Sequence, residues 1–277
     1  MKLTLLLLIF TACAKQILGQ DDESQTVRSN LTKVASSLPS RCGIAFPGRV
    51  IGGNVAVPHK YPWTSYLLIR KVVNGQQQNS YCGSTIISNW WLVTAAHCLD
   101  NAVQVEVRAG CLLNYQCEAI EAARGWIVHP SYDRRTLNND IALIQVQRPL
   151  RFSRKIQPSC LPGSYLGDNR GVIVVGWGAT SNNGPGSAAL KEGVMVSRNS
   201  GVCSRFFGSF SPLTMICVTR YNANVCSGDS GTSAGRFIGG RFQLDGVNSY
   251  VYYKGCDQGP NVLVRVSHYV SWIRAIV

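Results

Sequence analysis

The chain has 277 residues, 45% of them hydrophobic and 15% charged, and its formal net charge is +13 at pH 7. After an N-terminal apolar run, no stretch reaches the length of a membrane helix, and neither aromatic interleaving nor a nucleic-acid motif accompanies the basic residues. We therefore expect no membrane partner and no nucleic-acid partner.

The first residues predict a secretory signal peptide. The stretch MKLTLLLLIFTACA places one lysine before an apolar run and then small residues, and the run is too short to span a bilayer. A buried apolar helix is the alternative, and the position at the N-terminus argues against it. We assign the signal peptide to residues 1–19, with cleavage after residue 14 as an alternative, and expect a secreted, extracellular protein.

Secretion favours disulfide bonding of the 11 cysteines, because oxidising compartments favour disulfides. Loss of the signal peptide removes Cys13 and leaves ten cysteines, an even number that can pair completely. Zinc binding is the rival use, but the ten lack the paired short spacings of zinc ribbons and fingers. Disulfides are the better prediction.

Residues 20–49 are assigned to a pro-segment. Gln20 to Ser40 is polar and begins with an acidic triplet, which is the composition of a flexible extension. It contains Asn30 in Asn-Leu-Thr, a pattern for glycosylation that is short enough to occur by chance. The sequence leaves its occupancy open.

From Arg41 onward the chain reads as a globular all-β protein. Short runs such as WTSYLLIR, VQVEVRAG and GVIVVGWG are rich in β-formers and are separated by turn residues. Near the C-terminus, Tyr269, Trp272, Ile273 and Ile276 follow helical spacing and predict one helix with an apolar face. Residues 50–277 are enough for one compact β unit or two small barrels.

The densest basic run is RPLRFSRK. Its cations could contact a polyanion such as an acidic glycan, and a solvated loop is the alternative. The four cations are Arg148, Arg151, Arg154 and Lys155.

The stretch NVCSGDSGTSAG raises the question whether Ser230 is a turn serine or a nucleophile. A serine hydroxyl needs a base, and the base needs an orienting group. Among four histidines, only His97 sits in an apolar, small-residue frame, WLVTAAHC. Asp140 in NNDIALIQV precedes an apolar strand, where a carboxylate needs a partner, although alone it would suggest a turn or strand cap. The order His, Asp, Ser, each with distinctive neighbours, favours the nucleophile.

These segments resemble the trypsin-like, chymotrypsin-fold family of secreted serine endopeptidases. The resemblance rests on RVIGG, TAAHC, DIAL, GWG and SGDSG and covers the chain from about Arg49 to the C-terminus. It implies two antiparallel six-stranded β-barrels with a C-terminal helix. It also implies a monomer that hydrolyses protein or peptide substrates through an acyl-enzyme.

The same resemblance assigns roles to the three residues. His97 would be the general base, Asp140 would hold its tautomer, and Ser230 would attack the scissile carbonyl. The amides of Gly228 and Ser230 would form the oxyanion hole, since a glycine can turn its amide toward the substrate.

The resemblance further implies a zymogen. Cutting after Arg49 would free the α-amino group of Val50, which would pair with Asp229 beside the nucleophile. The enzyme should not cut its own Arg49 efficiently, so a separate trypsin-like activating protease is expected.

The family's disulfide pattern also fits the ten cysteines. The leftover pair in GCLLNYQC falls where some members have a calcium loop, and a local disulfide would replace the ion, so we predict no metal and no cofactor. The implied pairs are Cys42 with Cys160, Cys82 with Cys98, Cys111 with Cys117, Cys203 with Cys217, and Cys226 with Cys256.

The resemblance places the substrate pocket at four positions. Asn224 would form a floor without the negative charge that draws basic residues, and Ser249, Val251 and Asn261 would form the walls. Two side chains where glycine is common should make the pocket shallow, which favours small or medium apolar residues such as Ala, Val or Leu.

One departure keeps a second hypothesis open. The family usually continues GDSGGP, whereas this chain reads GDSGTS, and a β-branched Thr232 would be strained if its position needs a positive φ. The alternative is a catalytically weak or inactive homologue that serves as a binding or regulatory protein in an extracellular cascade.

Overall fold

The computed structural model describes residues 38–45 and 54–277. The expected signal peptide, the acceptor Asn30, and Arg49 and Val50 at the expected activation site lie outside these ranges. Within the described ranges, no helix combines the length and apolar character that a membrane crossing requires.

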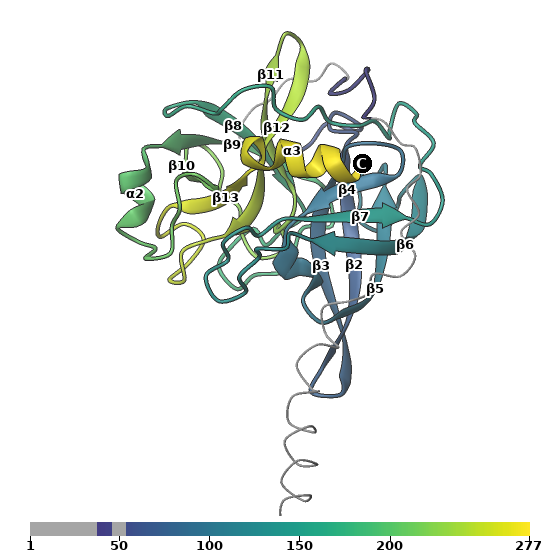
Figure 1. Ribbon diagram of the computed structural model, residues 1–277, viewed down its shortest axis with the longest axis horizontal. Helices are drawn as coiled ribbons and strands as arrows, with labels where there is room; N and C mark the ends of the chain where they lie inside the picture. The colour runs from purple at the N-terminus through teal and green to yellow at the C-terminus, as the bar shows by residue number, and fades with distance from the viewer. Residues whose placement is uncertain (1–37, 46–53) are drawn as a thin grey trace, which may run out of the picture.

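The N-terminal half of the described chain forms a closed antiparallel barrel in the order β2, β3, β4, β7, β6, β5 (Figure 1). Along β5, Val105 and Val107 are buried while the intervening Glu106 is partly exposed, as expected when alternate side chains face a core. The strands are β2 (Thr64–Val73), β3 (Gln76–Ile86), β4 (Trp91–Thr94), β5 (Ala102–Ala109), β6 (Ala119–Val128) and β7 (Ala142–Val146).

The C-terminal half forms a second antiparallel barrel. Its ring runs β8, β9, β10, β13, β12, β11 and closes where β11 pairs with β8, and the short strand β1 (Asn54–Val55) adds to β9. The prediction of two six-stranded barrels is therefore confirmed. The strands are β8 (Gly171–Gly176), β9 (Lys191–Arg198), β10 (Met215–Arg220), β11 (Ser233–Ile238), β12 (Arg241–Tyr250) and β13 (Asn261–Arg265).

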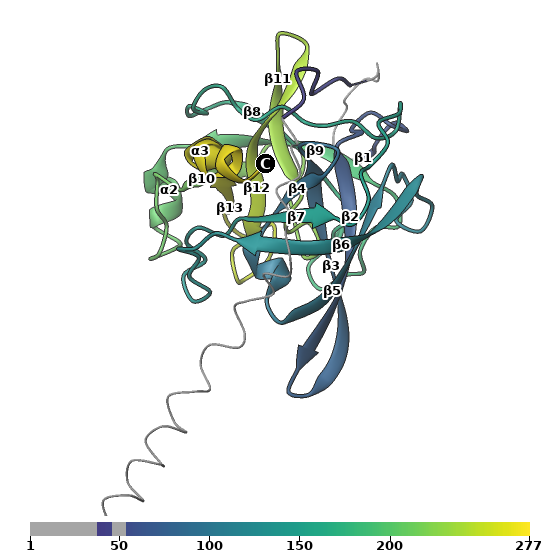
Figure 2. The same cartoon turned by 45° about the vertical axis from the view of Figure 1, so that its right-hand side comes forward.

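Three short helical elements complete the described chain: the 3-10 turn η1 (Ala96–Leu99), α2 (Ser200–Ser204) and the C-terminal α3 (Val266–Ile276). The predicted terminal helix is confirmed, and its Tyr269 and Ile273 pack into the core of the first barrel. The 45° view of Figure 2 shows α3 lying beside the second barrel with its end near the first. The helix thus fastens the two barrels together.

The five expected disulfides are all present. Two of them brace the segments that carry His97 and Ser230, because one partner lies next to the histidine and another lies four residues before the serine. The pairs are Cys42–Cys160, Cys82–Cys98, Cys111–Cys117, Cys203–Cys217 and Cys226–Cys256.

Candidate active site

His97 and Asp140 come together where two strands of the first barrel end. His97 lies in the turn after β4, and Asp140 lies just before β7, which pairs with β4. The ring Nδ1 of His97 lies 2.8 Å from Asp140 Oδ2, and the backbone N–H of His97 donates to Oδ1 at 2.8 Å. This double contact fixes both the ring and the backbone of the histidine.

Ser249 of the second barrel completes the surroundings of the carboxylate. Its Oγ donates to Asp140 Oδ2 at 2.5 Å. Asp140 is fully buried, whereas the side chain of His97 is 25% exposed. Because Nδ1 faces the carboxylate, a neutral His97 carries its proton there and keeps the lone pair on Nε2.

Two opposing effects set the pKa of His97. Burial alone would lower the pKa of the imidazole, but the charge and the hydrogen bond of Asp140 outweigh burial and raise it above the usual value. The buried aspartate therefore makes the ring a stronger base than a free histidine.

Ser230 belongs to a turn of the second barrel that lies against the histidine segment. The backbone N–H of Gly83 donates to the carbonyl of Ser230 at 2.7 Å. Gly231 follows with φ +81°, and a Cβ there would collide with Gly83 O and Thr94 Oγ1. Only glycine allows this approach, which brings Ser230 to the segment that carries His97.

The turn before Ser230 also depends on a glycine. Gly228 has φ +95°, a conformation that other residues rarely adopt. Within the described chain, the hydrogen bonds of the turn use the amides of Asp229, Gly231 and Thr232, and those of Gly228 and Ser230 take no part in them. Two amides on either side of Asp229 are thereby left for a ligand.

The expected strain at Thr232 is not found. The left-handed conformation falls on Gly231, and Thr232 does not have a positive φ. Its buried hydroxyl donates to the carbonyl of Asp229 at 2.7 Å and accepts from Nδ2 of Asn248 at 2.7 Å. At Thr232 the departure from the family pattern therefore gives no structural reason for weak activity.

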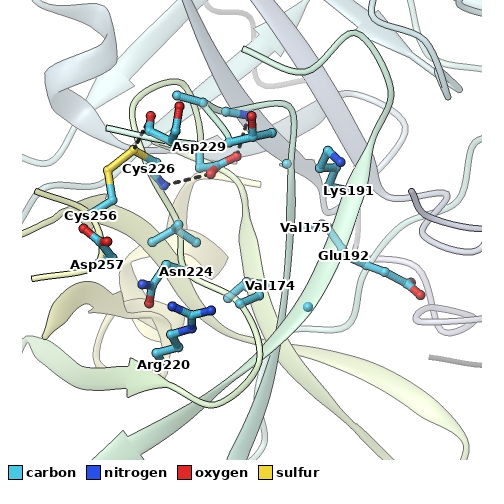
Figure 3. Close-up of a pocket in the computed structure, with 18 of the residues that line it drawn as sticks. Val174, Val175, Lys191, Glu192, Arg220, Asn224, Cys226, Asp229, Cys256 and Asp257 are labelled. Carbon is cyan, nitrogen blue, oxygen red and sulfur yellow. Dashed lines mark hydrogen bonds between the residues drawn. A yellow bond between two sulfur atoms is a disulfide. The ribbon is translucent and has the colours of Figure 1, made fainter. Parts of the chain in front are cut away.

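Asp229 is a buried carboxylate held only by backbone amides. Its oxygens accept from the N–H of Gly178 at 2.8 Å and of Cys226 at 2.9 Å, drawn as dashed lines in Figure 3. Burial raises its pKa to about 6, and the two amide hydrogen bonds oppose the rise. None of the ion pairs among the described residues includes it. Within residues 38–45 and 54–277, the carboxylate thus has no counter-charge.

A cavity of about 610 Å³ lies beside this carboxylate (Figure 3). Its lining includes Asp229, Gly178, Lys191 and Asn224. The position expected for the pocket floor therefore belongs to this larger cavity, and the structure does not bring Asn224 to the smaller cavity beside Ser230.

The smaller cavity measures about 250 Å³ and is lined by Ser230, Ser249 and Val251, together with Val225 and Asn248. Three of the expected site residues therefore meet in one place. Asn261, expected as a pocket wall, lines neither of these two cavities. It is fully buried on β13, and both atoms of its side-chain amide lack a hydrogen-bond partner among the described residues.

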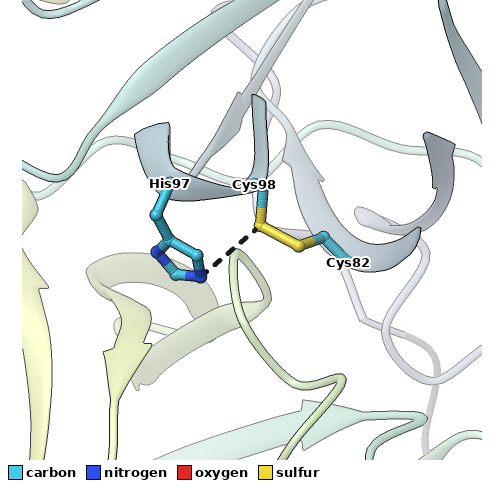
Figure 4. A group of neighbouring side chains, drawn as sticks. All are labelled: Cys82, His97 and Cys98. Carbon is cyan, nitrogen blue, oxygen red and sulfur yellow. Dashed lines mark hydrogen bonds between the residues drawn. A yellow bond between two sulfur atoms is a disulfide. The ribbon is translucent and has the colours of Figure 1, made fainter. Parts of the chain in front are cut away.

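Cys82, His97 and Cys98 form a cluster with their ligand atoms within 4.8 Å of one another (Figure 4). The two sulfurs are bonded to each other as a disulfide, so neither is the thiolate that a zinc site requires. His97 Nε2 lies 3.9 Å from Cys98 Sγ. The disulfide therefore braces the histidine segment.

The basic run is exposed, and part of its charge is already paired. Arg148 lies 3.0 Å from Glu121, and Lys155 lies 3.6 Å from Glu118. Arg151 is exposed as well, and Arg154 makes an interaction of its own.

Comparison with known proteins identifies the family. The family model described as Trypsin matches residues 50–273. This chain belongs to the trypsin family. It is a serine-type endopeptidase, and the two barrels, the disulfides and the residues around Ser230 agree with that membership.

Similar proteins include chymotrypsin-like elastase family member 1 of Felis catus, 32% identical over 83% of this chain and 90% of the relative. The protein of the same name from Homo sapiens is 31% identical over 83% of this chain and 92% of its own length. Transmembrane protease serine 9 of Rattus norvegicus is 31% identical over 87% of this chain, which covers 23% of that protein.

Sequence reasoning missed two buried polar contacts. Asn248 bonds to Thr232, and Lys60 Nζ lies 2.9 Å from a carboxylate oxygen of Glu192 with both side chains buried. The sequence signal for Asn248 is weak, a polar residue between Val247 and Ser249 near the end of β12. Nothing local pairs Lys60 with a residue 132 positions away.

Proposed function

We propose that this protein is secreted as a zymogen and that, once cut after Arg49, it hydrolyses peptide bonds through Ser230, His97 and Asp140. One observation carries the proposal: hydrogen bonds run from Ser249 through Asp140 to His97, and the carbonyl of Ser230 accepts from Gly83, whose neighbour Cys82 is bonded to Cys98 beside the histidine. A serine is activated in this way when a base is held beside it and oriented by a third group.

The chemistry follows from the proton positions. Asp140 keeps the proton of His97 on Nδ1, so Nε2 can accept the proton of Ser230 as its Oγ attacks the scissile carbonyl. The imidazolium that forms is stabilised by the buried carboxylate and then gives its proton to the leaving amine. A water molecule then attacks the acyl-enzyme with His97 again as the base, and the free serine is regenerated.

The reaction also requires that the negative charge that develops on the carbonyl oxygen be stabilised. The N–H groups of Gly228 and Ser230, which the hydrogen bonds of the turn do not use, are suited to donate hydrogen bonds to this oxygen. The positive φ of Gly228 supports that role, because the flanking peptide can then face the substrate.

Activation is proposed to act on Asp229. A buried carboxylate with no counter-charge is costly, and here it borders a cavity of about 610 Å³. The ammonium of Val50, freed by a trypsin-like activating protease, would enter this cavity and pair with Asp229. The turn that carries Gly228 and Ser230 would be stabilised in consequence.

The primary pocket is proposed to take small or medium side chains. Val225 and Val251 line a cavity of about 250 Å³ beside Ser230, and among the described residues Asp229 is the one carboxylate in its lining. Because Asp229 would be paired with Val50 in the cut form, Arg or Lys at the cleaved position would lack a partner, and the side chain of Val251 would limit how deeply a large ring can enter. Such a pocket gives a broad preference, because one methylene is worth only about 1–3 kcal/mol.

Secretion is supported by the five disulfides, which persist in oxidising compartments. A contact between the exposed basic run and a sulfated polysaccharide is part of the same proposal, with Arg151 as its most available cation.

The test is labelling with a serine-directed fluorophosphonate before and after limited cleavage by trypsin. We expect strong labelling of the cut wild type only, no labelling of Ser230→Ala, and no activation of Arg49→Gln. Full labelling of uncut Arg49→Gln would refute the zymogen, and a cut wild type that folds but never labels would refute the enzyme.

A further inference from the structure

A buried ion pair holds the segment that follows the expected activation site. Lys60 Nζ lies 2.9 Å from Glu192 Oε2 and 3.0 Å from Oε1, and the two side chains are only 4% and 3% exposed. Among the ion pairs of the described residues, no other has both side chains buried to this extent. Removing one partner would leave an uncompensated buried charge, so the pair holds both residues firmly.

Glu192 also lies opposite the short strand β1. In the pairing of β1 with β9, Asn54 is opposite Glu192 and Val55 is opposite Lys191. The chain then turns back, and the side chain of Lys60 reaches the same Glu192. A strand of two residues makes few ladder hydrogen bonds of its own, so the ion pair strengthens the attachment of β1 to β9.

The same strand register leads from β1 to Asp229. Lys191 pairs with Val55 on one side and with Gly176 of β8 on the other, so Val55 and Gly176 lie about 10 Å apart at the usual strand spacing. Asp229 lies directly against Gly176, since a Cβ at this glycine would collide with Asp229 Oδ1. The short strand β1 is thus two strand spacings from the buried carboxylate.

This spacing suits the amino group that cleavage after Arg49 would free. Val50 precedes Asn54 by four residues, which can span at most about 14 Å. Asp229 is within this reach while β1 keeps its place beside β9. If β1 came loose, the ammonium could move through a larger volume, and its effective concentration at Asp229 would fall.

We propose that Lys60 is a positioning residue for activation: its ion pair with Glu192 fixes β1 on β9 and thereby brings the new amino group of Val50 to Asp229. This inference rests on the proposed function and adds the contact that makes insertion of the amino group favourable. Because the pair lies outside the triad, its loss should weaken insertion and leave the chemistry of the inserted enzyme unchanged.

Lys60→Met tests the proposal in the full chain, with the wild type and the variant both cut after Arg49 by trypsin. Methionine keeps the unbranched shape and removes the charge. Cyanate modifies an accessible, uncharged α-amino group, so mass spectrometry of the N-terminal peptide reports how often Val50 is not inserted. We expect cyanate to modify Val50 at least about fivefold faster in the variant, because the freed end of β1 shifts the equilibrium away from insertion.

The alkaline limb of kcat/KM gives a second readout. Pairing with Asp229 raises the pKa of the inserted α-amino group above its usual value, and activity is lost when that group deprotonates. Weaker insertion therefore moves the alkaline midpoint to lower pH. A fivefold weaker equilibrium should lower the midpoint by about 0.7 pH unit, which is the same factor on a logarithmic scale.

Arg236→Met is the matched control. Arg236 forms an ion pair with the buried Asp245 at 2.8 Å, between β11 and β12, and neither of these strands pairs with β1 or β9. Its replacement should leave the cyanate rate and the alkaline midpoint at their wild-type values. Equal changes in both variants, or no change in Lys60→Met, would overturn the proposal.

If Lys60→Met does not fold, Glu192→Gln takes its place, because it removes the other charge of the pair and keeps the volume. It must shift both readouts in the same directions, and wild-type values for both would overturn the proposal. Failure of the proposed function looks different: Val50 of the cut wild type would react with cyanate as fast as in the unfolded chain.

Discussion

Replacing Asp229 with Asn should change how the stability of the uncut protein depends on pH. The carboxyl is buried and has no counter-charge from the described part of the chain, and burial raises its pKa from 3.8 to about 6. A shift of that size corresponds to about 3 kcal/mol between the two protonation states. The fold favours the protonated form, so this contribution to stability is fully present below pH 3.8 and is lost as the pH rises through about 6.

The assay is reversible guanidinium unfolding between pH 3.5 and 7.5, with disulfides intact, in a Ser230→Ala background that prevents self-digestion. Relative to Asp229→Asn, the uncut chain should lose about 3 kcal/mol of unfolding free energy over this range. The comparison with Asn cancels the titration of the other carboxyls.

Cleavage after Arg49 should reverse the direction in which the contribution of Asp229 to stability changes with pH. If the ammonium of Val50 pairs with Asp229, the pKa of the carboxyl falls below 3.8, and its contribution is then present above that pH and lost on acidification. Parallel pH profiles for the cut and uncut chains, each measured against its own Asp229→Asn variant, would refute the pairing.

Four further predictions concern the activated enzyme. Asp140→Asn should lower kcat by about 10⁴-fold, because His97 would adopt the wrong tautomer. Ser249→Ala removes one hydrogen-bond donor to Asp140 and should lower kcat/KM by about tenfold. Steady-state kinetics on one peptide substrate tests both variants. The acid limb of kcat/KM should have its midpoint above pH 6.5, because the pKa of His97 is raised and the base must be neutral; a midpoint below 6.5 would contradict this. Val251→Gly should raise kcat/KM for a Phe substrate relative to an Ala substrate by about tenfold or more. Paired anilide substrates measure this ratio. An unchanged ratio would mean that Val251 does not limit the size of the side chain at the cleaved position.

Much of the fold was predictable because its signals are local. Short β-rich runs between turn residues predicted the strands, and helical spacing around Tyr269 predicted α3. The neighbours of His97, Asp140 and Ser230 carried the family resemblance, and the structure brings the first two into direct contact. Each of these signals lies within about ten residues of chain.

Contacts between distant residues could not be predicted in the same way. Lys60 and Glu192 meet across 132 positions with both side chains buried, and neither has a neighbour that indicates its partner. The pocket shows the same limit, because Asn224 borders the larger cavity while Asn248, which was not expected, borders the smaller one. The side of a turn that a residue faces depends on backbone geometry, which could not be predicted from the amino-acid sequence.

Thr232 is the position where local reasoning and the structure differ most, and it supports a last prediction. If the threonine were strained, Thr232→Gly would restore the glycine usual at this position in the family and stabilise the protein. The structure implies the opposite. Gly83 has no room for a Cβ because the methyl of Thr232 fills that space, and the hydroxyl links Asp229 to Asn248.

Thr232→Gly should therefore lower the free energy of unfolding by roughly 2–4 kcal/mol, from a lost methyl contact, two lost hydrogen bonds and the added freedom of the unfolded chain. Guanidinium unfolding in the Ser230→Ala background measures the change. Thr232→Ser is the control, since it keeps the hydroxyl and should lose only the methyl, about 1 kcal/mol. A glycine variant as stable as the wild type would mean that the hydrogen bonds of Thr232 do not hold the turn of Ser230 in place.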